Sequence, residues 1–144
     1  MQKGSIVLID DSKAELRLLQ EAFLDVNYPH DLMTFTNGES AFAYISKAAS
    51  KIFIILCDIQ MPGMTGPNLL EKINAVPELK LEAIPFLFFS NSAEQKDIIH
   101  AYELAAQGYF QKPLSVPHMT DLFNRIIDYW SASYIPHGRH HRPF

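Results

Sequence analysis

The apolar residues of this chain gather mainly in short runs that are separated by longer segments of mixed polarity. Most of these runs are rich in β-branched or aromatic residues. A continuous apolar run of roughly four to eight residues is typical of a strand buried on both faces. We therefore predict five β-strands, at Ser5–Asp10, His30–Thr36, Ile52–Cys57, Phe86–Ser90 and Tyr109–Gln111.

The segments between these runs repeat apolar residues at helical spacing. Ser12 can cap the first helix, with Glu15 at the capping-box position, and the pattern continues to Asn27 before Tyr28-Pro29 breaks it. Pro62, Gly63 and Gly66 indicate a loop over residues 58–66. Four more helices are predicted: after Asn37-Gly38, from Pro67 to about Val76, through Ile98 to about Ala106, and from Val116 to Trp130.

Five strands that alternate with five helices predict an α/β fold. The expected architecture is a three-layer sandwich, in which right-handed crossovers connect the strands of a doubly wound parallel sheet. No internal repeat or interdomain linker interrupts the alternation. We expect one domain over residues 1–132 and a flexible tail over residues 133–144, where proline, histidine and arginine crowd together.

Composition narrows the class of protein. The 144 residues are 48% hydrophobic and 19% charged, which is typical of a globular domain. A net charge of -4 gives no basis for broad affinity to nucleic acid or anionic membranes. The single cysteine, Cys57, excludes an internal disulfide and fits a reducing compartment. No signal peptide or run of ~18 apolar residues is present, so we predict a cytoplasmic protein.

Polar side chains stand where the apolar runs stop. Because parallel strands place their carboxyl ends at one edge of the sheet, these side chains are expected to converge there. They are three carboxylates, a hydroxyl and an ammonium, contributed by Asp10, Asp11, Asp58, Ser90 and Lys112. This set suits the binding of a divalent cation and a phosphoryl group.

The same residues carry a resemblance to a known family. The chain from about Lys3 to Trp130 resembles the receiver domain of bacterial two-component response regulators. The residues that carry the resemblance are Asp10-Asp11, Asp58 with Met61-Pro62-Gly63-Met64-Thr65-Gly66, Ser90, and Tyr109 three residues before Lys112-Pro113. It implies the flavodoxin-like strand order 2-1-3-4-5. Each motif is weak alone, whereas their joint order at strand ends is a strong signal.

The resemblance implies a phosphoacceptor with a metal site. Asp58 matches the phosphoacceptor, because a carboxylate can hold a phosphoryl group as a mixed anhydride. The implied metal ligands are Asp11 directly, Asp10 through water, Asp58 itself, and the backbone carbonyl of Gln60. Mg²⁺ is the expected cofactor, since it prefers oxygen ligands and keeps several waters.

The resemblance also implies a switch. Lys112 matches the lysine that pairs with a phosphoryl oxygen, and the following Pro113 matches a cis peptide position. Ser90 matches the hydroxyl that binds the phosphoryl group, and Tyr109 the aromatic ring that turns inward with it. Phosphorylation then biases a surface built from the fourth helix, fifth strand and fifth helix.

Three further positions match sites that tune phosphoryl lifetime in the family. Gln60 stands two residues after the phosphoacceptor and Ser92 two residues after the hydroxyl. Asn91 fills a place that the family usually gives to a small residue. Our hypothesis is that Asn91 narrows access to the acyl phosphate, so that Asn91→Ala raises phosphorylation by small donors.

The expected biological role is that of a stand-alone response regulator. The residues after Trp130 are too few for an output module, so we expect no direct DNA binding and no enzyme activity beyond self-phosphorylation and autodephosphorylation. The expected partners are a sensor histidine kinase or a histidine phosphotransfer protein and a downstream protein that the sequence does not name. A homodimer through the 4-5-5 surface is also compatible with the resemblance.

Other interpretations fit the complete set of residues less well. Singly, each polar residue is as well explained by helix capping, loop structure or surface exposure. A haloacid-dehalogenase-type phosphatase needs a general acid where this chain has Gln60, and a flavodoxin-type FMN carrier needs a phosphate loop where it has two acids. A degenerate receiver that docks independently of phosphorylation is the main alternative.

Overall fold

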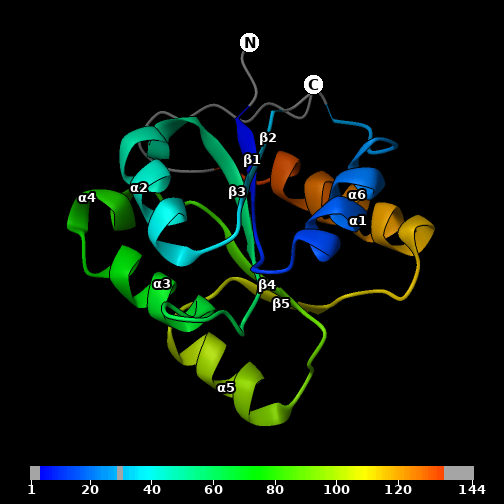
Figure 1. The fold of residues 1–144 in the computed structure, drawn as a ribbon. Helices are drawn as coiled ribbons and strands as arrows, with labels where there is room; N and C mark the ends of the chain where they lie inside the picture. The colour runs from blue at the N-terminus through cyan, green and yellow to red at the C-terminus, as the bar shows by residue number, and fades with distance from the viewer. Residues whose placement is uncertain (1–3, 29–30, 135–144) are drawn as a thin grey trace.

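A computed structural model describes residues 4–28 and 31–134. Its five strands form one parallel sheet in the order β2-β1-β3-β4-β5, which confirms the predicted fold class (Figure 1). The strands are β1 (Ser5–Ile9), β2 (Leu32–Phe35), β3 (Ile52–Cys57), β4 (Phe86–Ser90) and β5 (Gly108–Gln111). The helices are α1 (Lys13–Phe23), α2 (Gly38–Ala48), α3 (Gly66–Asn74), α4 (Pro77–Leu81), α5 (Gln95–Glu103) and α6 (Val116–Ala132), with a 3-10 turn, η1, at Ala49–Lys51.

The three central strands lie at the centre of the hydrophobic core. Every residue of β1, β3 and β4 is buried, whereas the edge strands β2 and β5 are mostly half-buried. Burial on both faces explains why the central strands read as continuous apolar runs in the sequence. Their register pairs Ile9 with Cys57 and Cys57 with Phe88, so the carboxyl ends of these strands finish side by side.

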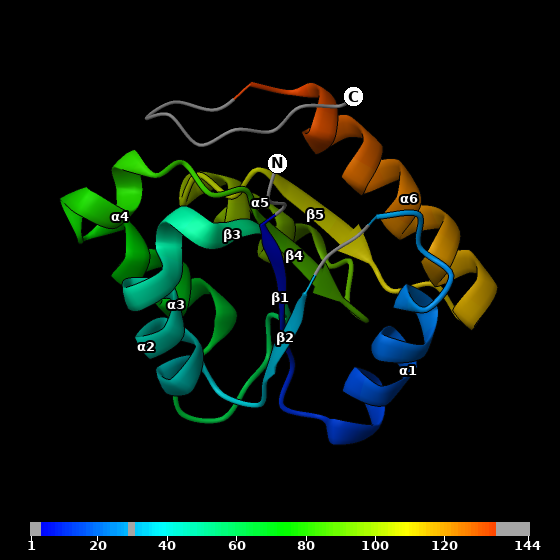
Figure 2. The same cartoon turned by 90° about the horizontal axis from the view of Figure 1, so that it is seen from above.

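Helices cover both faces of the sheet (Figure 2). On one face, α1 and α6 pack together, with the rings of Phe23 and Phe123 stacked at a centroid distance of 4.3 Å. On the other face, α2, α3, α4 and α5 bury residues such as Ile45, Leu69 and Ala101. One hydrophobic cluster lies between the sheet and each set of helices. The result is the three-layer arrangement that the alternating pattern predicts.

Several element boundaries differ from the sequence-based expectation. Helix α1 ends at Phe23 rather than near Asn27, and α5 ends at Glu103 rather than near Ala106. Ala105 has a φ of 67°, a left-handed conformation that cannot continue a helix. The second strand begins at Leu32, while the predicted start at His30 lies outside the described residues.

A short helix that the pattern did not predict follows α3. Helix α4 has only five residues, and Val76 before it provides no side-chain cap. Pro77 occupies its first turn, where the missing N–H costs nothing. Leu79 is buried against the same cluster as α3, so tertiary packing rather than periodicity defines this helix.

Within the described residues, every helix is too short or too polar to cross a lipid bilayer. Cys57, the single thiol, is buried in β3. Of the predicted tail, only Ser133 and Tyr134 belong to the described part of the chain, and α6 ends just before them.

Candidate functional site

The candidate site lies at the carboxyl edge of the sheet, where hydrogen bonds between strand ends hold its backbone. The Asp10 N–H donates to Phe35 O at 3.0 Å, and the Asp58 N–H donates to Ile9 O at 2.9 Å. The Lys112 N–H donates to Ser90 O at 2.8 Å. Each functional residue therefore follows directly from a paired strand, and the strand register fixes where its side chain begins.

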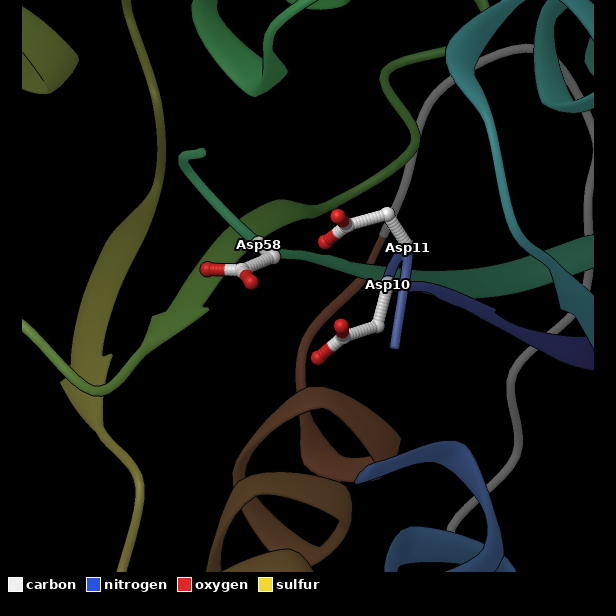
Figure 3. A group of neighbouring side chains, drawn as sticks. All are labelled: Asp10, Asp11 and Asp58. Carbon is white, nitrogen blue, oxygen red and sulfur yellow. The ribbon is translucent and has the colours of Figure 1, made fainter. Parts of the chain in front are cut away.

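Three carboxylates gather at this edge, as the sequence predicts. One oxygen from each of Asp10, Asp11 and Asp58 lies within 4.8 Å of the other two. Figure 3 shows Asp10 and Asp11 extending from the end of β1 beside Asp58, which follows β3. Asp10 is buried, Asp58 is half-buried and Asp11 is exposed, so the cluster opens to solvent on one side.

Asp10 is the most constrained of the three acids. Its Oδ1 accepts the Ser12 N–H at 2.9 Å, and its Oδ2 accepts a hydrogen bond from Lys112 Nζ at 2.5 Å. The Asp10 and Lys112 side chains are each only 2% exposed. A buried ion pair with these additional hydrogen bonds compensates for the loss of hydration.

Lys112 contacts carboxylates from three parts of the chain. Besides Asp10, its Nζ donates to Glu15 Oε1 at 3.0 Å and lies 3.7 Å from Asp58 Oδ2. Burial by itself lowers the pKa of Lys112, but the hydrogen bond to Asp10 and the charges of Asp58 and Asp10 outweigh it and raise the pKa. Lys112 is therefore a fixed positive charge at neutral pH, directed at the acid cluster.

The carboxylate of Asp58 is held in one orientation, and its pKa is shifted. Its Oδ1 accepts the Ile59 N–H at 2.8 Å, which orients the carboxylate. Burial is the main reason that its pKa is raised, the charge of Lys112 opposes the rise, and the charge of Asp10 adds to it. The Ile59 N–H and the Ser90 hydroxyl also oppose the rise.

Ser90 and Tyr109, the two residues of the expected switch, meet at the loop between β4 and α5. Ser90 is 3% exposed, and its Oγ accepts the Ser92 N–H at 3.2 Å. The Tyr109 hydroxyl donates to Ser92 O at 2.8 Å. Burial, with a contribution from the Asp97 charge, raises the pKa of Tyr109, so the phenol remains a donor. Both side chains are thus tied to one loop.

The positions expected to tune phosphoryl lifetime lie around the rim. Gln60 and Asn91 are exposed, and Ser92 is half-buried. The Asn91 carbonyl accepts a hydrogen bond from Gln111 Nε2 at 3.1 Å, and Ser92 Oγ donates to Asp97 Oδ2 at 3.4 Å. Asn91 and Ser92 are therefore held through β5 and α5 at the mouth of the site.

One sequence-based expectation at the site is wrong. The bond between Lys112 and Pro113 is trans, and no peptide bond in residues 4–28 and 31–134 is cis. The trans form is the intrinsically favoured isomer even before proline, so a motif match alone does not establish a cis bond.

Glu15 belongs to the site although the sequence assigned it a different task. The pattern placed it in a capping box with Ser12, and its N–H does donate to Ser12 Oγ at 3.2 Å. Its carboxylate, however, binds Lys112, which is 97 residues away along the chain. No local signal could have shown this contact.

The donor set fits a small divalent cation. Carboxylate oxygens are hard ligands, and clustered carboxylates repel one another unless a cation lies among them. Both oxygens of Asp10 already accept hydrogen bonds, whereas Asp11 is exposed and has the freer carboxylate. This difference favours Asp11 as a direct ligand and Asp10 as a ligand acting through water.

Known proteins share this fold and sequence pattern. The model of the response regulator receiver domain family matches residues 6–124. The chain is 28% identical over 130 residues to Response regulator Rcp1 of Synechocystis sp., covering 87% of each protein. The structure of the phosphorylated cyanobacterial phytochrome response regulator RcpA aligns with a TM-score of 0.81 and 30% identity, over 94% of this chain and 99% of RcpA. The Mn²⁺-bound form of Rcp1 aligns with a TM-score of 0.76 and 27% identity, over 93% and 99% of the two chains.

Proposed function

Since this chain belongs to the receiver domain family of response regulators, the phosphoacceptor modules of phosphorelay signalling, we propose that Asp58 accepts a phosphoryl group from a histidine kinase or a histidine phosphotransfer protein. One observation carries the proposal: Asp58 lies at one sheet edge with two further carboxylates and 3.7 Å from the Lys112 ammonium. Receiver domains bind a divalent metal at such an acidic site, and RcpA, a structural neighbour, has been crystallised in its phosphorylated form.

The proposed reaction is an in-line displacement at phosphorus. An Asp58 carboxylate oxygen forms the new O–P bond while the P–N bond to the donor histidine breaks, and the departing imidazole nitrogen regains an electron pair and takes up a proton. Lys112 pairs with a phosphoryl oxygen, and the Ser90 hydroxyl donates to another. Asp58, Asp11, Asp10 and the Gln60 carbonyl would hold Mg²⁺, which when bound neutralises charge on the nucleophile and the phosphoryl oxygens.

The proposed output is a change in partner binding through the surface of α5, β5 and α6. The Tyr109 hydroxyl is bonded to Ser92, two residues after Ser90, so movement of the Ser90 hydroxyl is coupled to the Tyr109 ring. Ile99 and Tyr102 on α5 are about half exposed and supply apolar contact area on this helix. Such a surface suits a downstream protein or a second copy of the chain.

Since a buried free thiol needs no oxidising environment, the cytoplasm remains the proposed compartment.

Incubation with Mg²⁺ and acetyl phosphate tests the proposal directly. The expected result is one added phosphoryl group on Asp58, measured by intact-protein and peptide mass spectrometry. Asp58→Asn should take up none, because an amide is not a nucleophile for phosphorus. A stable fold that acquires no phosphoryl group under any Mg²⁺ concentration would favour the phosphorylation-independent docking module instead.

Asn91→Ala should raise the rate of phosphorylation by acetyl phosphate about two- to fivefold, an order-of-magnitude expectation for easier access to the nucleophile. Asn91 is exposed, and its contact with Gln111 uses the backbone carbonyl, so alanine preserves that hydrogen bond. The measurement is the initial rate at saturating Mg²⁺. An unchanged rate would remove the assignment of Asn91 to access control.

A further inference from the structure

Lys112 has a second anionic partner that lies outside the expected acid cluster. Glu15 Oε1 is 3.0 Å from Lys112 Nζ, a hydrogen-bond distance, whereas Asp58 Oδ2 is 3.7 Å away. The Glu15 side chain is 29% exposed and that of Lys112 is 2% exposed. The Glu15 carboxylate therefore lies closer to the ammonium than the carboxylate of the candidate phosphoacceptor does, and it is more exposed to solvent than Lys112 is.

The local structure of α1 explains why this carboxylate is available. Glu15 lies in the first turn of α1, three residues after the N-cap Ser12. In a capping box its carboxylate would accept the Ser12 N–H, but Asp10 Oδ1 already accepts that N–H at 2.9 Å. Since the donor is satisfied, the Glu15 side chain is free to reach across to Lys112.

The charges of these groups do not balance. The ammonium of Lys112 faces the carboxylates of Asp10, Glu15 and Asp58, and Asp11 completes the acid cluster. A divalent cation reduces the excess of negative charge, but a phosphoryl group on Asp58 increases it again. The Glu15 carboxylate thus offsets part of the positive charge of Lys112, with which the phosphoryl group would pair.

We propose that Glu15 is a positioning residue that acts through Lys112 as an electrostatic brake on phosphorylation. The inference rests on the proposed function of Asp58. Before phosphorylation, Glu15 and Asp10 hold the Lys112 ammonium with two of its three hydrogens. The phosphoryl group must compete with Glu15 for this ammonium while being repelled by the Glu15 charge. Glu15 therefore slows formation of the acyl phosphate and favours cation binding.

Glu15→Gln is the decisive substitution because it removes the charge and keeps an amide oxygen that can accept the Lys112 hydrogen bond. Glu15→Ala removes both the charge and the hydrogen bond. Glu21→Gln, on an exposed turn of the same helix, is the matched control for the change in net charge. Thermal unfolding of all variants checks that each one is folded.

The first measurement is the initial rate of phosphorylation by acetyl phosphate at saturating Mg²⁺, where an Asp58 oxygen displaces acetate from phosphorus. We expect Glu15→Gln to be roughly three- to tenfold faster than wild type, the size of effect for one unit charge at the partly solvated edge of a site. Glu15→Ala should be faster by a similar factor, and Glu21→Gln unchanged. The difference should shrink as ionic strength rises.

The second measurement is Mg²⁺ affinity by isothermal titration calorimetry, without a phosphodonor. Glu15→Gln should bind Mg²⁺ roughly two- to fivefold more weakly, since it removes an attractive charge. A purely structural role would weaken both properties, whereas the brake weakens cation binding and accelerates phosphorylation.

The two proposals can fail separately. Wild-type protein that takes up no phosphoryl group would overturn the proposed function, and with it the brake. Wild-type protein that is phosphorylated, with Glu15→Gln equal or slower, would overturn the brake alone. Glu15→Ala slower than wild type with Glu15→Gln unchanged would also overturn it, because it would show that the hydrogen bond rather than the charge matters.

Discussion

Lys112→Met is expected to remove about 3–5 kcal/mol from the free energy of unfolding in Mg²⁺-free buffer, the usual cost of leaving one member of a buried ion pair without its partner. Asp10, whose side chain is 2% exposed, would lose the hydrogen bond and the charge that compensate its burial. Methionine has about the length and volume of lysine, so the loss reports on the charge of the ammonium and its hydrogen bonds rather than on packing. Urea denaturation, with the midpoint and the slope fitted together, measures this change in the free energy of unfolding.

Two controls separate the ion pair from general effects of losing a lysine. Lys47→Met, on the exposed last turn of α2, changes net charge equally and should alter stability by less than about 0.5 kcal/mol. The double variant Asp10→Asn with Lys112→Met should recover much of the loss, because the most deeply buried carboxylate is then no longer left charged without its partner. Equal losses in the single and double variants would show that the pair is not what stabilises this edge.

The pH dependence of wild-type stability has a definite sign at Lys112. Because the folded protein raises the pKa of Lys112 above 10.5, folding favours the protonated form. The stabilisation is fully present below pH 10.5 and is lost as pH rises through the higher folded pKa. Lys112→Met should show less of this alkaline loss than wild type.

Gly66→Ala is expected to cost about 3 kcal/mol or more of unfolding free energy, above the usual range for adding one methyl group to a packed site. A Cβ on Gly66 would overlap the backbone carbonyl oxygen of Asp58 and lie 2.8 Å from Phe88 Cε1. Backbone cannot move aside as a flexible side chain can, so Asp58 itself must shift. We therefore expect phosphorylation by acetyl phosphate to fall as well as stability.

Gly63→Ala, in the loop that precedes α3, is the matched control. Gly63 has a φ of 78°, and its nearest neighbour to a new Cβ is Glu39 Oε2 at 3.7 Å. It should lose only about 1–2 kcal/mol, the cost of a left-handed alanine without a steric clash. If Gly66→Ala is no more damaging than Gly63→Ala, the tight approach between Gly66 and Asp58 has no energetic consequence.

Most of the fold could be predicted because buried parallel strands leave a strong local signal. The runs that became β1, β3 and β4 are apolar throughout since both faces are covered. Helix α4 was not predicted because five residues show too little periodicity. Its formation depends instead on the burial of Leu79. Helix ends were also shifted, because local conformations such as the positive φ of Ala105 terminate a helix without a clear sequence signal.

The sequence by itself determined which side chains stand at the strand ends, and thereby predicted that Asp10, Asp58 and Lys112 meet. Parallel pairing brings strand ends to one edge whatever the details of packing. Only the tertiary structure decided how these groups are paired: that Lys112 binds Asp10 and Glu15 more closely than Asp58, that its bond to Pro113 is trans, and that Gly66 lies against the Asp58 backbone. Periodicity reports which face of an element is buried, whereas pairing depends on distances between residues far apart in the chain.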